Sequence, residues 1–335
     1  MNILFTCAGR RTYLLKYFRE NLSKGDKIVA TDMQLSAPAL QAADIRIQVP
    51  SIYDPTYVDI MLDICKKYEV SILIPLNDLE LPILAEHKTC FERAGVRVIV
   101  SRPEVIAVCF DKYETARWVK SIGLQTPRTY ICVEDVKDAL SKGEIEFPMF
   151  MKPRWGSGSI GLESVSDLEE LEITYYFLKK KLKKTILATA SVSEESIIIQ
   201  EKLTGAEFGL DVMNDLNENN IAVSVKQKLA MRAGETDKAV TVDIPAVREI
   251  GQKIGEQLRH IGNLDVDIMQ RSNGDYCVLE LNPRFGGGYP FSYEAGVNMP
   301  KAIIEWVREN QVEPSILHPI YNKTFSKNDY LMEIF

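Results

Sequence analysis

The sequence predicts two kinds of sheet in one chain: a parallel α/β sheet at the N-terminus, followed by an α+β region with an antiparallel sheet. Strand-like and helix-like patterns alternate as far as Val100, which is typical of a parallel sheet covered by helices. After Ser196 the strand patterns follow one another through short turns, which favours antiparallel pairing. The 335 residues are enough for roughly two or three structural units.

The composition is that of an ordinary globular protein, with 46% hydrophobic and 26% charged residues. The net charge of −7 argues against general nucleic-acid binding, which needs a basic surface. No apolar run reaches the ~18 residues of a membrane span, and the first residues lack the charged region of a signal peptide. The six cysteines form no Cys-x-x-Cys pair and the three histidines lie far apart. We therefore expect a cytoplasmic protein without a disulfide framework or a zinc site.

The N-terminal strands are predicted at residues 2–6, 27–30, 45–49, 70–75 and 96–100. Ligands bind such sheets at the carboxyl ends of the strands. Polar side chains at these ends form a candidate substrate pocket: Arg10, Arg11, Asp78 and Glu80. A dinucleotide site in the first turn is disfavoured, because the turn has only Gly9 where that fingerprint has three glycines.

A glycine-rich loop follows the predicted strand that ends at Lys152, with glycines at positions 156, 158 and 161. A dinucleotide site would need a helix directly after the loop, but the capping pattern at 166–169 starts the next helix later. A Walker A loop is excluded because Leu162 follows the last glycine. The loop predicts a flap whose backbone N–H groups cover phosphates, with Lys152 as the cation. An ordinary glycine-rich hairpin is the alternative.

A predicted strand near the C-terminus carries Glu280 and Asn282 on one face, because side chains alternate along a strand. Pro283 ends the strand, and Arg284 and three glycines follow. The turn at 273–274 pairs this strand with the one at 264–270, which brings Asp267 to the same face. These oxygen ligands suit Mg²⁺, with Mn²⁺ as a substitute.

Two further segments are less informative. Residues 231–238 have the composition of a mobile loop, and Arg232 within it is a candidate substrate residue. The segment 311–335 has apolar clusters that could pack on a domain of this chain or on a second subunit of a homodimer.

The order of the motifs resembles the ATP-grasp superfamily, in a form similar to a single ATP-grasp unit of the carbamoyl-phosphate synthetase large chain. The resemblance covers about residues 1–310 and is carried by Asp111-Lys112, Lys152 with its glycine loop, Gln200-Glu201-Lys202-Leu203, Gly205-x-Glu207 and Glu280-x-Asn282-Pro283-Arg284. It implies a Rossmann-like pre-ATP-grasp domain at 1–105, a lid and first subdomain at 106–195, an antiparallel C-terminal subdomain at 196–310 and a tail at 311–335.

The resemblance also implies roles for single residues. The ATP-binding set is Lys112, Lys152, Gly156, Ser157, Gly158, Gly161, Glu201, Lys202, Leu203 and Glu207. The metal ligands are Asp267, Glu280 and Asn282, and the catalytic residues at the transferred phosphoryl group are Arg284 and Lys152. The implied cofactors are ATP and Mg²⁺.

The implied activity is that of an ATP-dependent carboxylate–amine (or thiol) ligase that works through an acyl phosphate. Its partners would be small-molecule acids and amines, without nucleic acid or membrane. Three alternatives stay open: an ATP-binding module without turnover, one split unit of a carbamoyl-phosphate-synthetase-type enzyme, and a nicotinamide-dependent oxidoreductase. The length fits one ATP-grasp unit, whereas the full synthetase chain carries two.

Overall fold

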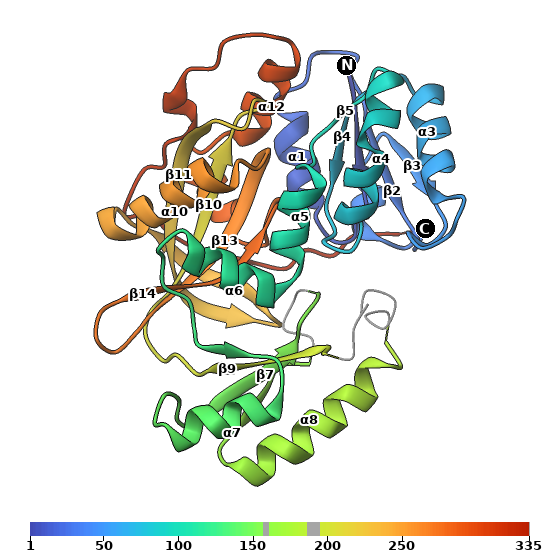
Figure 1. The fold of residues 1–335 in the computed structure, drawn as a ribbon. Coiled ribbons are helices and arrows are strands. Elements are labelled where there is room, and N and C mark those ends of the chain that lie inside the picture. Colours follow the sequence, from blue (N-terminus) through green and yellow to red (C-terminus); the bar gives the residue numbers. More distant parts are fainter. Residues whose placement is uncertain (157–160, 186–194, 335) are drawn as a thin grey trace.

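The computed structural model describes residues 1–156, 161–185 and 195–334, whose strands form three sheets (Figure 1). The first is a parallel sheet in the order β3-β2-β1-β4-β5. Its strands are β1 (Asn2–Thr6), β2 (Ile28–Asp32), β3 (Ile45–Gln48), β4 (Val70–Pro75) and β5 (Arg97–Val98). The predicted parallel N-terminal domain is confirmed.

Helices cover both faces of this sheet because successive side chains of its strands point to opposite sides. Ile3 and Phe5 pack with α1 (Thr12–Arg19) and α2 (Pro38–Gln41), whereas Leu4 packs with α3 (Tyr57–Lys67) and α4 (Leu81–Arg93). The face of Ile3 also holds α11 (Tyr289–Glu294), α12 (Met299–Val307) and the 3-10 helix η1 (Pro314–Leu317). The C-terminal helices therefore share a core with the N-terminal domain.

The second sheet is antiparallel, in the order β14-β13-β10-β11-β12-β15. Its strands are β10 (Glu207–Asn214), β11 (Asn220–Arg232), β12 (Glu235–Thr241), β13 (Gly262–Gln270), β14 (Tyr276–Asn282) and β15 (Thr324–Ser326). One face packs against α5 (Pro103–Phe110), α6 (Lys112–Ser121) and α10 (Pro245–Leu258) through residues such as Leu264 and Val266. The alternate residues, Asp265 and Asp267, belong to the other, polar face.

The third sheet forms the lid, at the lower end of Figure 1. Its order is β6-β9-β7-β8, from β6 (Thr129–Tyr130), β7 (Met149–Pro153), β8 (Glu163–Val165) and β9 (Ile197–Glu201). Helices α7 (Val133–Ser141) and α8 (Leu168–Leu182) cover one face. The structure thus places β9 in the lid sheet, whereas α5 and α6 pack on the antiparallel sheet. Both placements differ from the domain boundaries suggested by the sequence, which group residues 106–195 as one unit and begin the antiparallel subdomain at residue 196.

Two segments that the sequence left less defined form strands of the antiparallel sheet. The predicted mobile loop at 231–238 is instead the end of a β-hairpin, in which Ala233 and Gly234 both have positive φ, at 50° and 79°. Two such residues form the tight turn that matches the twist of a hairpin. The tail returns to the same sheet, where β15 pairs with β12 of its own chain.

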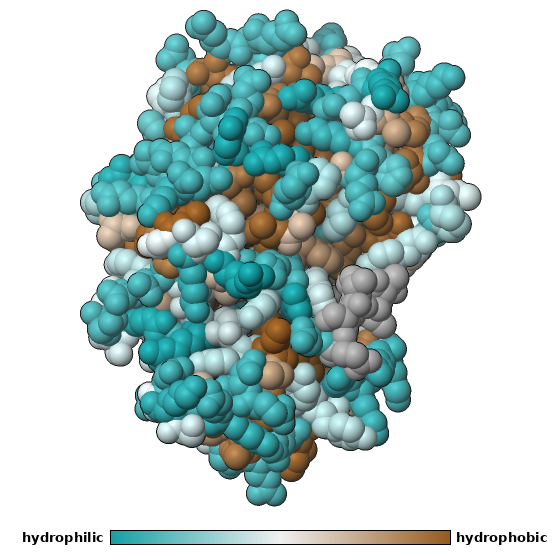
Figure 2. All heavy atoms as spheres, viewed as in Figure 1, coloured by the Kyte–Doolittle hydropathy of each residue, from teal (hydrophilic) through white to brown (hydrophobic). Residues whose placement is uncertain are grey.

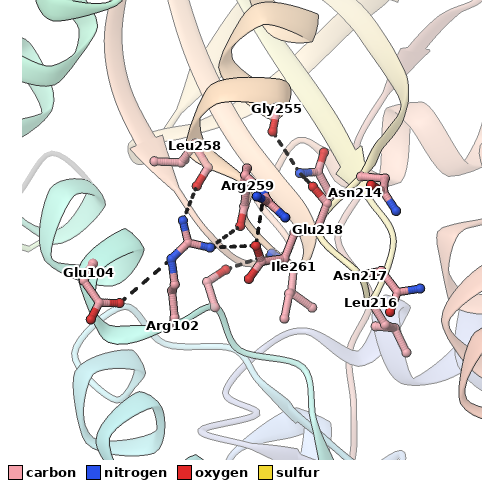
Figure 3. A network of polar contacts seen from close by, with 12 residues as sticks. Arg102, Glu104, Asn214, Leu216, Asn217, Glu218, Gly255, Leu258, Arg259 and Ile261 are labelled. Carbon is pink, nitrogen blue, oxygen red and sulfur yellow. Dashed lines mark hydrogen bonds and ion pairs between the residues drawn. The ribbon is translucent and has the colours of Figure 1, made fainter.

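The N-terminal domain is fixed to the antiparallel sheet by a polar network around Arg102 (Figure 3). Its guanidinium pairs with Glu218 at 2.8 Å and donates to the carbonyl of Arg259 at 3.2 Å, at the end of α10. A cation at this position offsets the negative end of the helix dipole. Beside it, the hydroxyl of Ser101 accepts from the backbone N–H of Ile261 at 2.9 Å.

The surface is mostly hydrophilic on the face drawn in Figure 2, with apolar side chains along the seam between the domains and on the lid. On the lid helix α8, Ile173, Tyr176 and Phe177 are exposed. Within the described ranges no helix combines the length and the apolar character that a membrane crossing requires. All six cysteines are unpaired.

Ser101→Ala tests the junction between the domains. Ser101 is 1% exposed, and its loss leaves the N–H of Ile261 buried without a partner. We expect a loss of about 1–3 kcal/mol in the free energy of unfolding. Denaturant melts of this variant should be compared with those of Ser141→Ala, which removes an exposed hydroxyl. Equal stability of the two variants would contradict the assignment.

Candidate functional site

A cleft of about 570 Å³ lies between the lid sheet and the polar face of the antiparallel sheet. The lid contributes side chains from β7 and β9, the sheet contributes β10 to β14, and the N-terminal domain contributes Arg11. The predicted site residues that line it are Arg11, Lys112, Lys152, Gly156, Glu201, Leu203, Glu207, Asp267, Glu280, Asn282 and Arg284.

Asp111 connects the start of α6, which carries Lys112, to Arg154 beside the lid strand β7. Its carboxylate caps α6 by accepting from the N–H of Tyr113 at 3.0 Å, and it accepts from Arg154 Nε at 2.8 Å. The backbone N–H of Lys112 donates to the carbonyl of Arg154, and its ammonium to the carbonyl of Gly156. Lys112 is therefore held at the start of the glycine loop, on a helix that packs on the antiparallel sheet.

Lys152 lies at the end of β7 and faces the same region. Burial lowers the pKa of Lys152 to about 8, with Lys112 adding to the decrease and Glu280 opposing it. A lysine in this state carries its positive charge at a desolvation cost. A polyanion bound beside it would remove that cost, so the site is prepared for negative charge.

Glu280 keeps its negative charge because of the two lysines. Burial alone raises the pKa of Glu280, but Lys112 and Lys152 together lower it below the ordinary value, and Asn282 donates to Oε1 at 3.2 Å. Asp267 stands opposite Glu280 in the pairing of β13 with β14.

Lys228 forms an ion pair with Asp267, the third predicted metal ligand. Its ammonium pairs with Asp267 at 2.6 Å and with Glu207 at 2.7 Å. Burial lowers the pKa of Lys228, but the two carboxylates outweigh that effect and raise it. Asp267 is therefore balanced by Lys228, whereas Glu280 is balanced by Lys112 and Lys152.

The donor set fits a hard divalent cation. Two carboxylates and an amide oxygen on adjacent strands resemble the partial coordination that Mg²⁺ accepts when phosphates and waters complete it. Histidine, cysteine, aspartate and glutamate form no cluster of three or more among the residues that the structure describes, so the protein alone does not complete a cage. Glu280 and Asn282, with Asp267 across the strands, would hold the ion.

Arg284 is buried between the two domains. It donates to Asp78 Oδ2 at 2.8 Å and pairs with Asp265 at 3.6 Å. Burial lowers the pKa of Arg284, but these two carboxylates raise it above its ordinary value. Its Nε–H is buried and makes no hydrogen bond to any described residue. Arg284 lines the cleft, but this donor itself is out of contact with solvent and is an exception to the usual pairing of buried polar groups.

The three glycines after Arg284 leave room for charged side chains. A Cβ on Gly286 would lie 2.1 Å from the Asp265 carboxyl carbon, one on Gly288 would lie 2.8 Å from Lys226 Cε, and one on Gly287 would lie 3.1 Å from the Glu235 carboxyl carbon. The glycine run is explained by these contacts, which let Asp265, Lys226 and Glu235 reach the cleft.

The opposite end of the cleft is more apolar, lined by Pro127, Phe150, Leu203, Met269 and Leu279. Glu201 there accepts from Arg271 and from the N–H of Arg128 at 2.8 Å. The N–H of Leu203 donates to no described residue. An apolar slot with a spare backbone donor suits a flat heterocyclic base.

Two family models match the chain in succession. The first is described as PylC-like, N-terminal domain, and matches residues 3–99. The second is described as ATP-grasp in the biosynthetic pathway with Ter operon, and matches residues 193–325, which include Glu201, Glu280 and Arg284. The second match and the fold make this chain similar to ATP-grasp proteins.

Curated relatives agree with the ATP-grasp assignment. The chain is 26% identical over 272 residues to the carbamoyl phosphate synthase large chain, N-terminal section, of Aquifex aeolicus, covering 74% of this chain and 46% of that protein. It is 27% identical over 222 residues to a D-alanine–D-alanine ligase of Corynebacterium aurimucosum, covering 60% and 58%. The chain thus spans about half the length of these relatives.

Solved structures share the ATP-grasp fold. Biotin carboxylase from Campylobacter jejuni superposes with a TM-score of 0.75 at 17% identity, covering 96% of this chain and 74% of that one. An L-amino acid ligase from Bacillus licheniformis gives 0.68 at 16% identity, covering 96% and 78%. At this identity they establish the fold and nothing finer.

Several predicted site residues lie elsewhere in this ATP-grasp structure. Glu80 is fully buried in the N-terminal domain, where it accepts from Thr6 at 2.7 Å and Tyr57 at 2.6 Å. Its burial removes it from the substrate pocket and corrects that expectation. Arg232 is exposed on the hairpin and pairs with Asp329 at 2.6 Å.

The remaining predicted residues have peripheral places. Arg10 is exposed beside Arg11, and Asp78 acts on the cleft through Arg284. Lys202 points its ammonium at the ring of Phe150, 5.0 Å from the centroid, and Gly161 has a φ of +71° next to Pro153. Ser157 and Gly158 lie outside the described residues.

The sequence reasoning missed four charged residues of the cleft: Lys226, Lys228, Glu235 and Asp265. Lys226 is fully buried and pairs with Asp211 at 2.6 Å. The alternation of charges along 226–228 and 265–267 was the available signal. It repeats the period-2 pattern of Glu280 and Asn282, and on strands of one sheet such residues share a face.

The pKa of Lys152 predicts a pH dependence of ATP binding. Above about pH 8 the free protein loses the Lys152 proton, so binding must take a proton up, and the Kd for Mg–ATP should rise towards about tenfold per pH unit. Lys152→Arg stays charged and should lack this rise. Calorimetric titrations between pH 7 and 10 (roughly the range that brackets this pKa) measure both, and parallel slopes would contradict the role of Lys152.

The glycine run predicts a graded series of alanine variants. Gly286→Ala forces apart the buried Asp265 and Arg284, and should cost about 1–3 kcal/mol of stability. Gly287→Ala meets the exposed, flexible end of Glu235 and should cost less than about 1 kcal/mol. Gly288→Ala should fall between them. The order in denaturant melts is the check, and equal losses would show that the close approaches are not decisive.

Proposed function

We propose that this chain is an ATP- and Mg²⁺-dependent ligase that activates a carboxylate as an acyl phosphate and joins it to an amine or thiol. The observation that carries the proposal is the convergence in one cleft of Lys112, Lys152, the Glu280–Asn282 pair and Arg284. The relatives named as ligases support the same class of reaction.

The arrangement suits phosphoryl transfer because that reaction depends on the management of charge. Lys112 and Lys152 would neutralise the β- and γ-phosphates, and a divalent ion held by Glu280 and Asn282 would supply further positive charge. The carboxylate oxygen of the substrate attacks the γ-phosphorus, the bond to ADP breaks, and ADP leaves with the electron pair. The guanidinium of Arg284, which lines the cleft, would donate to an oxygen of the transferred group.

The second half-reaction makes the product. The amine nitrogen attacks the acyl carbon, inorganic phosphate leaves with the electron pair, and the nitrogen loses a proton. Because water would hydrolyse the acyl phosphate, the lid helps by covering the cleft. The apolar slot beside Leu203 and the charged end beside Arg284 provide separate places for the base and for the acceptor.

A split unit of a carbamoyl-phosphate-synthetase-type enzyme is a second candidate, favoured by the match to a protein named as an N-terminal section of that chain. It would use bicarbonate as the carboxylate and ammonia as the amine. Formation of carbamoyl phosphate, measured against a panel of organic acids and amines, separates the two candidates.

Glu280→Gln tests the proposal at one atom. The amide keeps the size of the side chain but removes the charge, so ADP release with a productive acid and amine should fall by about a hundredfold, close to 2.7 kcal/mol of barrier. Glu86→Gln, an exposed change on α4, should leave the rate unchanged. If a broad acid-by-amine panel gave no ADP while ATP bound, or if Glu280→Gln kept its rate, the proposed chemistry would be wrong.

A further inference from the structure

Beside Arg284, the cleft is lined by two charged residues that are distant in sequence. Arg11 comes from the turn after β1 and Glu235 from the start of β12. Lys327, in the segment after β15, is not among the lining residues but pairs with Glu235. Gly287 forms the floor beneath Glu235. The proposed phosphoryl chemistry uses none of these charged side chains, and the family motifs do not include them.

The tail positions Glu235. Strand β15 pairs with β12 through Lys238–Ser326 and Ala239–Phe325, and the N–H of Lys327 donates to the carbonyl of Asp237 at 2.8 Å. This register places the ammonium of Lys327 3.0 Å from Glu235 Oε2. The C-terminal segment thus supports Glu235 from outside the lining of the cleft.

The Lys327–Glu235 pair is open to a ligand. The Glu235 side chain is 60% exposed, so the pair is worth little energetically. The ammonium occupies Oε2, and Oε1 makes no hydrogen bond to a described residue. The carboxylate therefore keeps an acceptor for a second cation.

Arg11 supplies the opposite charge. The guanidinium of Arg11 donates to the carbonyl of Leu76. Burial raises the pKa of the Glu235 carboxyl, but Lys327 outweighs that effect and lowers it, and Arg11 is close enough to add to the decrease. Burial and the neighbouring Arg284 lower the pKa of Arg11 itself. Two guanidiniums thus crowd one side of the pocket, and an anion between them would relieve their repulsion.

These charges discriminate between classes of small molecule. A simple carboxylate would pair with Arg11 but bring a negative charge against Glu235. A simple amine would pair with Glu235 but face the positive charges of Arg11 and Lys327. A molecule with an ammonium and a carboxylate on neighbouring atoms satisfies both sides at once.

We propose that this end of the cleft binds a zwitterionic α-amino acid as one substrate of the ligase, with its carboxylate at Arg11 and its ammonium at Glu235, and that Lys327 is a positioning residue for Glu235. The assignment rests on the proposed function, since it supplies one of that reaction's substrates. It also gives the C-terminal segment a role in specificity.

The test uses the full chain loaded with a non-hydrolysable Mg–ATP analogue. A set of L- and D-α-amino acids is titrated by calorimetry, each beside the acid that lacks the amino group and the amine that lacks the carboxyl group. At least one amino acid should bind about tenfold or more tightly than both of its counterparts. An acid or amine that binds as tightly, or a set in which no amino acid binds, overturns the proposal.

Variants separate recognition from structure. Glu235→Gln and Arg11→Lys should each raise the amino-acid Kd about tenfold or more while the Kd of the nucleotide analogue stays the same. Lys327→Met should raise the amino-acid Kd severalfold, and Lys327→Arg should restore it. Lys323→Met, an exposed change on the same tail, is the control and should have no effect. An unchanged amino-acid Kd in Glu235→Gln would refute the assignment.

Failure of the proposed ligase function and failure of the amino-acid assignment would give different results. If the nucleotide analogue does not bind, the proposed function fails and the amino-acid site falls with it. If the analogue binds and ADP is released with simple acids, but amino acids have no preference, the ligase stands and only the substrate assignment is wrong.

Discussion

The ion pair between Arg284 and Asp78 joins the two domains at the point where the chemistry is proposed. Arg284 follows β14 of the antiparallel sheet, and Asp78 follows β4 of the parallel sheet. Both are nearly buried, so removing one partner would leave an uncompensated charge, at a cost of about 3–5 kcal/mol. Asp265 forms a second ion pair with Arg284, and Gly286 leaves the room that the Asp265 carboxylate needs. The position of the cleft depends on this contact.

The rest of the cleft balances charge by interleaving opposite signs on adjacent strands. Lys228 lies between Glu207 and Asp267, Lys226 is paired with Asp211, and Lys112 and Lys152 keep Glu280 ionised. These pairs let one face of a sheet carry many charges away from bulk water. They also separate the cleft into an apolar end, a phosphate end and an end with both charges, which correspond to the base, the triphosphate and the acceptor of the proposed reaction.

Most of the fold could be predicted from local patterns. The alternation around Ile3, Leu4 and Phe5 gives a sheet covered on both faces, and Asn273-Gly274 gives the β13–β14 hairpin and its register. The hairpin at 233–234 resembles a loop in the sequence, because residues 231–235 are all exposed and show no alternation in burial. The sequence alone does not exclude Glu80 from the substrate pocket, because an acidic residue after a strand has the same sequence pattern whether it faces a pocket or is buried against Tyr57. The contact between Lys327 and Glu235 could not be predicted from the sequence, since only the pairing of the tail with β12 brings the two residues together.

A crystal structure of the chain with a non-hydrolysable Mg–ATP analogue would show whether the nucleotide occupies this cleft. We expect the base in the apolar slot beside Leu203, the triphosphate between Lys112 and Lys152, and the ion on Glu280 and Asn282. A nucleotide bound elsewhere, for example at the Gly9 turn of the parallel sheet, or an ion without contact to Glu280, would contradict this expectation.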